Sequence, residues 1–109
     1  MEYVRRHSFP QLPSRMDCAF FFDSIGEARF YRNSDPGRTM INLYEIDLVD
    51  PKAVQHRTDW RRVSPSGPVD LTWIVDYWSG TMLLPHESGH ICQEVLAVTP
   101  LKIVAQHPF

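Results

Sequence analysis

Apolar and polar side chains alternate most regularly over residues 39–49 of the chain. Successive side chains of an extended backbone point to opposite faces, so this period of two predicts a strand. One face would carry Asn42, Tyr44, Ile46 and Leu48, and the other Ile41, Leu43, Glu45 and Asp47. The sequence Val49-Asp50-Pro51 should end the strand, and we expect at most a short helix near residues 52–55.

A second strand and a helix are predicted before this segment. Residues 16–22 end in a run of consecutive apolar side chains, which is typical of a strand buried on both faces. Ser24 is followed three residues later by Glu27, a pair that forms a capping box at the start of a helix. This helix would run through Tyr31 and end at the turn-forming residues 33–37.

The second half of the chain predicts a long loop and another helix. We expect residues 56–68 to form an ordered loop that is anchored by Trp60. Pro68 suits a first helical position, and Gly80 suits the position just after a helix. Between them, one stripe at helical spacing carries the side chains of Val69, Trp73, Ile74, Tyr77 and Trp78.

The remaining segments complete an α+β pattern. Residues 2–7 predict a short helix, and the prolines within residues 8–14 predict a rigid extended entry to the first strand. Residues 91–98 and 101–106 read as two final strands, separated by a Thr-Pro turn. The predicted order is therefore strand, helix, strand, helix and two strands, with two or three short helices in all.

Composition indicates one soluble domain that spans residues 1–109. The chain has 109 residues, which is enough for a single core, and 43% of them are hydrophobic. No apolar run approaches the roughly 18 residues of a membrane span, and no signal-peptide core follows the N-terminus. Cys18 and Cys92 are too few for a disulfide framework. We therefore expect reduced thiols, a cytoplasmic protein and no membrane partner.

The charged residues exclude one function class and suggest another. A net charge of −2 argues against a generic nucleic-acid-binding surface. Nine arginines stand against only two lysines, however. Arginine suits fixed, forked contacts to carboxylates or phosphates, although solvated ion pairs would also account for this bias.

The most conspicuous motif is His86-Glu87-Ser88-Gly89-His90, which matches the H-E-x-x-H pattern of zinc proteases. On a helix, His86 and His90 would share one metal and Glu87 would activate the bound water. Serine and glycine are poor residues for a helix interior, and no third ligand is evident. We therefore expect a surface loop without a metal, and keep a zinc hydrolase as an alternative.

Glu94 is the less conspicuous but stronger candidate. It lies near the start of the predicted strand 91–98, and its neighbours Cys92 and Leu96 on the same face should be buried. A carboxylate on such a face must be paired, solvated in a cleft or functional, because burying a bare charge is costly. Pairing with one of the many arginines is the structural alternative to a catalytic role.

The order of these segments resembles that of a known superfamily. Residues 9–22, followed by 24–30, are similar to the second strand and next helix of rifampin ADP-ribosyltransferases, and to an uncharacterised family of small bacterial proteins. Residues 38–51, with Tyr44-Glu45-Ile46 in mid-strand, resemble the next strand of these enzymes. Residues 93–98 resemble the strand that carries the catalytic glutamate in DNA-targeting ADP-ribosyltransferases. The resemblance covers residues 4–106.

The resemblance implies a split β-sandwich that uses NAD as a substrate. Glu94 would stabilise the oxocarbenium-like state and grip a ribose hydroxyl. Arg15, with Ser14 beside it, would hold the NAD pyrophosphate, and an aromatic ring would stack on nicotinamide. The candidates for this ring are Phe20, Phe22 and Tyr31, although aromatic residues in such segments are more often core residues. The acceptor would be a protein, a nucleic acid or a small molecule.

One departure from the superfamily leaves a second function open. Its members begin with a strand whose His or Arg holds the adenosine side of NAD, and the chain has no obvious version of it. His7 is the nearest candidate, but the residues that follow do not resemble that strand. A degenerate fold of this kind could serve as a non-catalytic binding or inhibitor protein, of phage or mobile-element origin, rather than as a toxin or enzyme.

Overall fold

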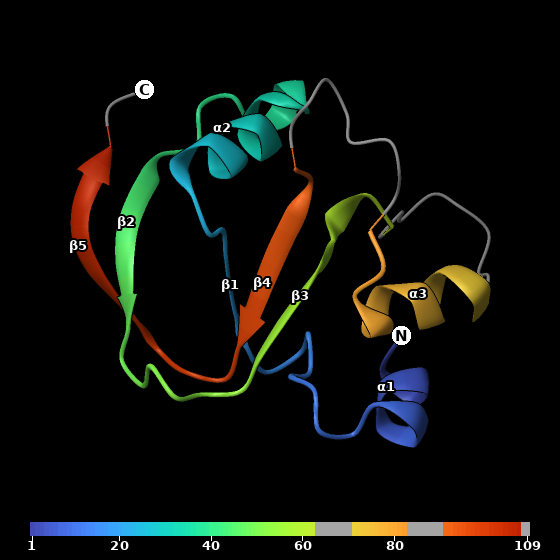
Figure 1. The fold of residues 1–109 in the computed structure, drawn as a ribbon. Coiled ribbons are helices and arrows are strands. Elements are labelled where there is room, and N and C mark those ends of the chain that lie inside the picture. The colour runs from blue at the N-terminus through green and yellow to red at the C-terminus, as the bar shows by residue number, and fades with distance from the viewer. Residues whose placement is uncertain (63–70, 83–90, 108–109) are drawn as a thin grey trace.

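The protein is an α+β domain with two antiparallel sheets (Figure 1). A computed structural model describes residues 1–62, 71–82 and 91–107, without the side chains of residues 71–73. Short 3₁₀ helices cover Pro36–Arg38 and Trp60–Arg62. The other elements are α1 (Glu2–Ser8), β1 (Ala19–Phe21), α2 (Ile25–Asn33), β2 (Leu43–Leu48), β3 (Gln55–Asp59), α3 (Leu71–Ser79), β4 (Gln93–Ala97) and β5 (Leu101–His107).

Strand β4 lies at the centre of the larger sheet, which has the order β1-β4-β3. Its register places Phe20 opposite Leu96 and Thr58 opposite Glu94. The smaller sheet pairs β2 with β5, and its register shifts between Glu45 and Ile46. In Figure 1, α1 and α3 lie beside β3, and α2 lies near the ends of both sheets. Central strand β4 is consequently buried along most of its length.

Among the described residues, helix α3 supplies three of the four members of the buried core cluster. Ile74, Tyr77 and Trp78 are at most 2% exposed and pack with Leu96 of β4. Burying a side chain of this size contributes about 1.5–3 kcal/mol relative to exposing it. This confirms the predicted apolar stripe for these residues, whereas Val69 and the side chain of Trp73 lie outside the described part of the chain.

The predicted start of α2 and the predicted end of α3 are confirmed by their caps, whereas Pro68, the predicted start of the second helix, lies outside the described residues. Ser24 accepts a hydrogen bond from the backbone N–H of Glu27 at 3.2 Å, and its hydroxyl donates to the Glu27 carboxylate at 2.8 Å. Gly80 follows α3 with φ of 77°, a left-handed conformation that glycine adopts without steric cost. A Cβ at Gly80 would lie 3.0 Å from the backbone oxygen of Arg57, so glycine also permits the close approach of α3 to β3.

Strand β3 was not predicted. No helix forms near residues 52–55, where we expected at most a short one, and Gln55–Asp59 is a strand rather than part of the predicted loop. Its sequence Gln-His-Arg-Thr-Asp contains no apolar alternation, which is the signal that identifies half-buried strands. His56, Thr58 and Asp59 are nevertheless buried. Hydrogen bonds allow this burial: His56 and Thr58, for example, each contact the backbone oxygen of Tyr77.

Strand β1 is shorter and more exposed than predicted. It covers only Ala19–Phe21, and Met16, which we expected in the strand, is 84% exposed. Burial on both faces is also wrong, because Phe20 is 42% exposed. The reason is its position: β1 pairs with β4 alone and forms an edge of the sheet, a context that an apolar run does not reveal.

Both cysteines and Trp60 lie in the described part of the chain. Cys18 and Cys92 are free thiols, and Cys92 is buried whereas Cys18 is partly exposed. Trp60, which we expected to anchor the loop of residues 56–68, packs edge-on against Tyr31 with ring centroids 5.1 Å apart. Residues 63–68 of that predicted loop lie outside the described residues. Among the described residues, none forms a helix long and apolar enough to cross a membrane.

Candidate functional site

Glu94 lies on the central strand and points to the side of the sheet covered by α3. It shares this face with Leu96, two residues along β4, and Leu96 packs against Tyr77 of α3. Glu94 is only 8% exposed. The carboxylate therefore needs partners, since an unpaired buried charge is strongly unfavourable.

Arg15 and Tyr77 are these partners. Nη1 of Arg15 donates to Oε1 of Glu94 at 2.7 Å, and the Tyr77 hydroxyl donates to the same oxygen at 2.7 Å. Nη1 of Arg15 also donates to the Tyr77 hydroxyl oxygen, which closes a triangle of contacts. The loop between α1 and β1 brings Arg15 to this position, and the buried Pro13 fixes that loop.

The electrostatics of this triangle keep its donors protonated. Burial, together with the negative charge of Glu94, raises the pKa of Tyr77 well above its ordinary value. Burial opposes the charge of Arg15, but its contacts with Tyr77 and Glu94 raise the pKa of Arg15 overall. Tyr77 therefore remains a hydrogen-bond donor to Glu94, and Arg15 remains a cation beside it.

The backbone of Tyr77 is held in turn by strand β3. Thr58 donates from its hydroxyl to the Tyr77 carbonyl at 2.6 Å, and Nε2 of His56 lies 2.9 Å from the same oxygen. The His56 ring also stacks on Trp78 with centroids 5.6 Å apart. Two buried polar residues of β3 thus fix the end of α3 that carries the Tyr77 hydroxyl.

We expect His56 to make stability depend on pH. Burial lowers the pKa of His56 below its ordinary value of 6.5, so the folded state takes up this proton less readily than the unfolded state. Its contribution should be present above pH 6.5 and be lost as the pH falls towards the lowered value. Urea unfolding at about pH 7.5 and about pH 5 should show this loss.

The matched variant is His56→Gln, which keeps a side-chain N–H donor but does not titrate. The loss of unfolding free energy between the two pH values should be smaller in this variant than in the wild type. An equal loss in both proteins would mean that His56 is not the group responsible.

Phe20 completes the site on its exposed side. The guanidinium carbon of Arg15 lies 4.8 Å from the centroid of the Phe20 ring and 5.3 Å from that of Tyr77. These distances suit cation–π contacts. Because Phe20 is 42% exposed, an aromatic surface next to Arg15 faces solvent. Glu94, Arg15 and Phe20, which the sequence singled out separately, therefore form one cluster.

The other predicted cofactor residues lie elsewhere. The ring of Phe22 packs on Tyr31 with centroids 5.1 Å apart, and Arg38 lies 4.1 Å over the Tyr31 ring. Within the described residues, neither ring contacts Glu94 or Arg15. Ser14 precedes Arg15, but its hydroxyl accepts a hydrogen bond from the backbone of Met16 at 3.1 Å.

Sequence reasoning missed the role of Tyr77. The position of Tyr77 on the apolar stripe of α3 was predicted correctly, but the partner of its hydroxyl was not predicted. A tyrosine predicted to be fully buried needs a hydrogen-bond partner for its hydroxyl, and this requirement was the available signal. His56 and Thr58 were missed because they lie on the strand that the sequence pattern did not predict.

The motif His86-Glu87-Ser88-Gly89-His90 lies outside the described residues, so the structure does not test the zinc alternative. In residues 1–62, 71–82 and 91–107, no group of three or more His, Cys, Asp or Glu side chains is placed to hold a metal ion.

No protein-family model, no curated protein and no solved structure matches the chain.

Proposed function

We propose that the protein is an NAD-dependent ADP-ribosyltransferase whose reacting carboxylate is Glu94. The observation that carries the proposal is the convergence of Glu94, Arg15 and Phe20, although Arg15 and Glu94 are 79 positions apart in the chain. A carboxylate, a guanidinium and an exposed aromatic ring supply the three contacts that the ribose, pyrophosphate and nicotinamide of NAD require.

The proposed chemistry breaks the bond between nicotinamide and ribose. The bonding electrons leave with nicotinamide, and the ribose carbon gains oxocarbenium character. Glu94 would stabilise this positive charge and accept a hydrogen bond from a ribose hydroxyl. A nucleophilic atom of the acceptor then bonds to the ribose carbon and loses its proton.

Arg15 has two roles in this scheme. In the structure, Nη1 of Arg15 is paired with Glu94 at 2.7 Å. When NAD binds, the pyrophosphate would attract the guanidinium and release the Glu94 carboxylate towards the ribose, while Tyr77 keeps its hydrogen bond to Glu94.

The arrangement of the strands supports the further proposal that the domain is an ADP-ribosyltransferase-like split β-sandwich. Sheets of three and two antiparallel strands occur in one domain, and the strand that carries Glu94 is the middle one of the larger sheet. A carboxylate in this position is held by neighbours on both sides, as a preorganised electrostatic site requires.

Incubation with labelled NAD and a cell lysate tests the function. We expect label transfer to an acceptor or hydrolysis of NAD, and a loss of about 100-fold or more in Glu94→Gln, because removing one transition-state contact typically costs this much. Asp76→Asn is the matched control, since the Asp76 carboxylate pairs with Arg62 and not with Arg15 or Glu94. No transfer and no hydrolysis by the wild type would overturn the proposal.

A second candidate is a non-catalytic binding or inhibitor protein on a degenerate form of this fold. The burial of Glu94 favours it, because a carboxylate that is 8% exposed and paired with arginine is satisfied without a ligand. Calorimetric titration with NAD separates the candidates: saturable binding favours the enzyme, and its absence favours the binding protein. Elemental analysis for stoichiometric zinc tests the remaining alternative at His86, Glu87 and His90.

A further inference from the structure

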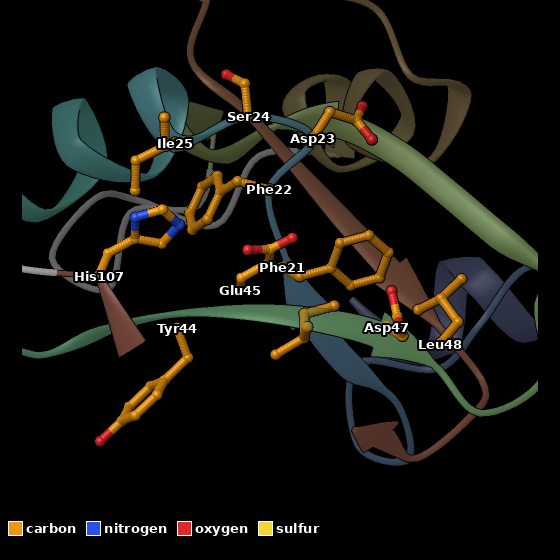
Figure 2. Close-up of a pocket in the computed structure, with 11 residues that line it drawn as sticks. Phe21, Phe22, Asp23, Ser24, Ile25, Tyr44, Glu45, Asp47, Leu48 and His107 are labelled. Atoms are coloured by element: carbon orange, nitrogen blue, oxygen red, sulfur yellow. The ribbon is translucent and has the colours of Figure 1, made fainter. Parts of the chain in front are cut away.

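A cavity of about 390 Å³ lies between the two sheets (Figure 2). The end of β1 and the start of α2 form one wall, which presents Phe21, Phe22 and Ile25. Strand β2 forms the opposite wall, and His107 at the end of β5 lies at one side. A volume of this size is within the range of sites that bind small molecules.

This cavity and the Glu94 cluster are on opposite faces of the larger sheet. Phe20 is paired with Leu96, which faces α3, whereas Phe21 is paired with Val95. Neighbouring residues of a strand point to opposite sides, so Phe21 faces away from Glu94 and towards β2. The cavity is therefore separate from the proposed NAD site, and a ligand in it would not contact Glu94.

The charged side chains of the cavity are carboxylates. Glu45 and Asp47 point from β2 towards Phe21 and Phe22, whereas the ring of Tyr44 points away (Figure 2). Among the described residues that line the cavity, none is a lysine or an arginine. A third carboxylate, Asp23, is neutralised by two hydrogen bonds from Arg57.

Glu45 and Asp47 differ from Asp23 in having no such partner among the described residues. Lys102 is the cross-strand neighbour of Asp47, yet no ion pair joins them in this part of the chain. The side of β2 that faces the cavity thus carries two acidic, solvent-exposed side chains opposite aromatic rings.

We propose that this cavity binds a small organic cation with an apolar body. The carboxylates of Glu45 and Asp47 would attract an ammonium or guanidinium group, and the faces of Phe21 and Phe22 would pack on the apolar part. A neutral ligand would gain only the apolar contact. An anion, including the NAD pyrophosphate, would be repelled by the same carboxylates.

Three compounds of similar shape and different charge test the proposal. NMR titrations with 2-phenylethylamine, 2-phenylethanol and 3-phenylpropionate should give saturable shifts at β1 and β2 for the amine. We expect the amine to bind at least about 10-fold more tightly than the other two, which corresponds to the attraction of one partly solvated charge. Equal affinities, or no saturable shift at these strands, would overturn the proposal.

The variant Glu45→Gln/Asp47→Asn tests the residues themselves. Both side chains are exposed, so the variant should fold and unfold at the same temperature as the wild type or a higher one. It should bind the amine about 10-fold more weakly and bind 2-phenylethanol unchanged. Asp35→Asn, outside the cavity, should change neither affinity. Unchanged amine binding in the double variant would contradict the assignment. Neither outcome depends on transferase activity.

Discussion

Replacing Arg15 with methionine should lower the free energy of unfolding by about 3 kcal/mol, because it leaves a buried carboxylate with its hydroxyl partner alone. Glu94 has a side chain that is 10% exposed, and that of Arg15 is 26% exposed, so water compensates the lost ion pair only in part. Methionine retains the length and apolar volume of the arginine stem. Urea unfolding of the variant and the wild type measures the difference.

Two comparisons identify the cause of this loss. Arg57→Met breaks an ion pair with Asp23 whose side chains are 45% and 37% exposed, and it should cost less than about 1 kcal/mol. Arg15→Met/Glu94→Gln removes both charges but leaves an amide oxygen for the buried Tyr77 hydroxyl, and it should recover most of the stability. Similar losses in Arg15→Met and Arg57→Met would mean that the pair at Glu94 behaves like a surface ion pair.

Trp78→Ala should lower the free energy of unfolding by about 3–5 kcal/mol, the usual cost of truncating a buried tryptophan. Trp78 is 1% exposed, stacks on His56 and donates from Nε1 to the backbone oxygen of Met1 at 3.1 Å. The substitution removes the ring contact with His56 of β3 and the hydrogen bond to the backbone of Met1. Thermal and urea unfolding both report the change.

Val75→Ala is the matched control on the same helix. Val75 is 43% exposed and lies on the face of α3 away from the core, so its truncation should cost less than about 0.5 kcal/mol. A loss in Trp78→Ala that is no larger than in Val75→Ala would contradict the core described for this domain.

Segments with regular periodicity were predictable from the sequence. Strand β2 and the buried stripe of α3 follow from apolar residues at periods that only one kind of element satisfies. Strand β3 could not be predicted in this way, because its buried His56 and Thr58 are polar and depend on the Tyr77 carbonyl. Tertiary hydrogen bonds of this kind leave no local pattern.

The candidate site was predictable only in part, for a related reason. Glu94 stood out as a carboxylate on an apolar strand, and Arg15 as a cation next to rigid prolines. Their contact depends on how the loop after α1 folds over α3, which no local sequence signal specifies. Phe22 and Tyr31 were plausible stacking partners by residue type. In the structure, Phe22 follows the end of β1 and packs on Tyr31 of α2, so the two rings form a separate aromatic cluster.

The central claim is that Glu94, Arg15 and Phe20 together bind NAD. Backbone and arginine side-chain NMR signals, followed during titration with NAD, test it most directly. We predict saturable shifts at these three residues and at Tyr77, with none at Glu45 or Asp47 in the cavity between the sheets. No saturable shift at Arg15 and Glu94, or shifts confined to that cavity, would contradict the claim.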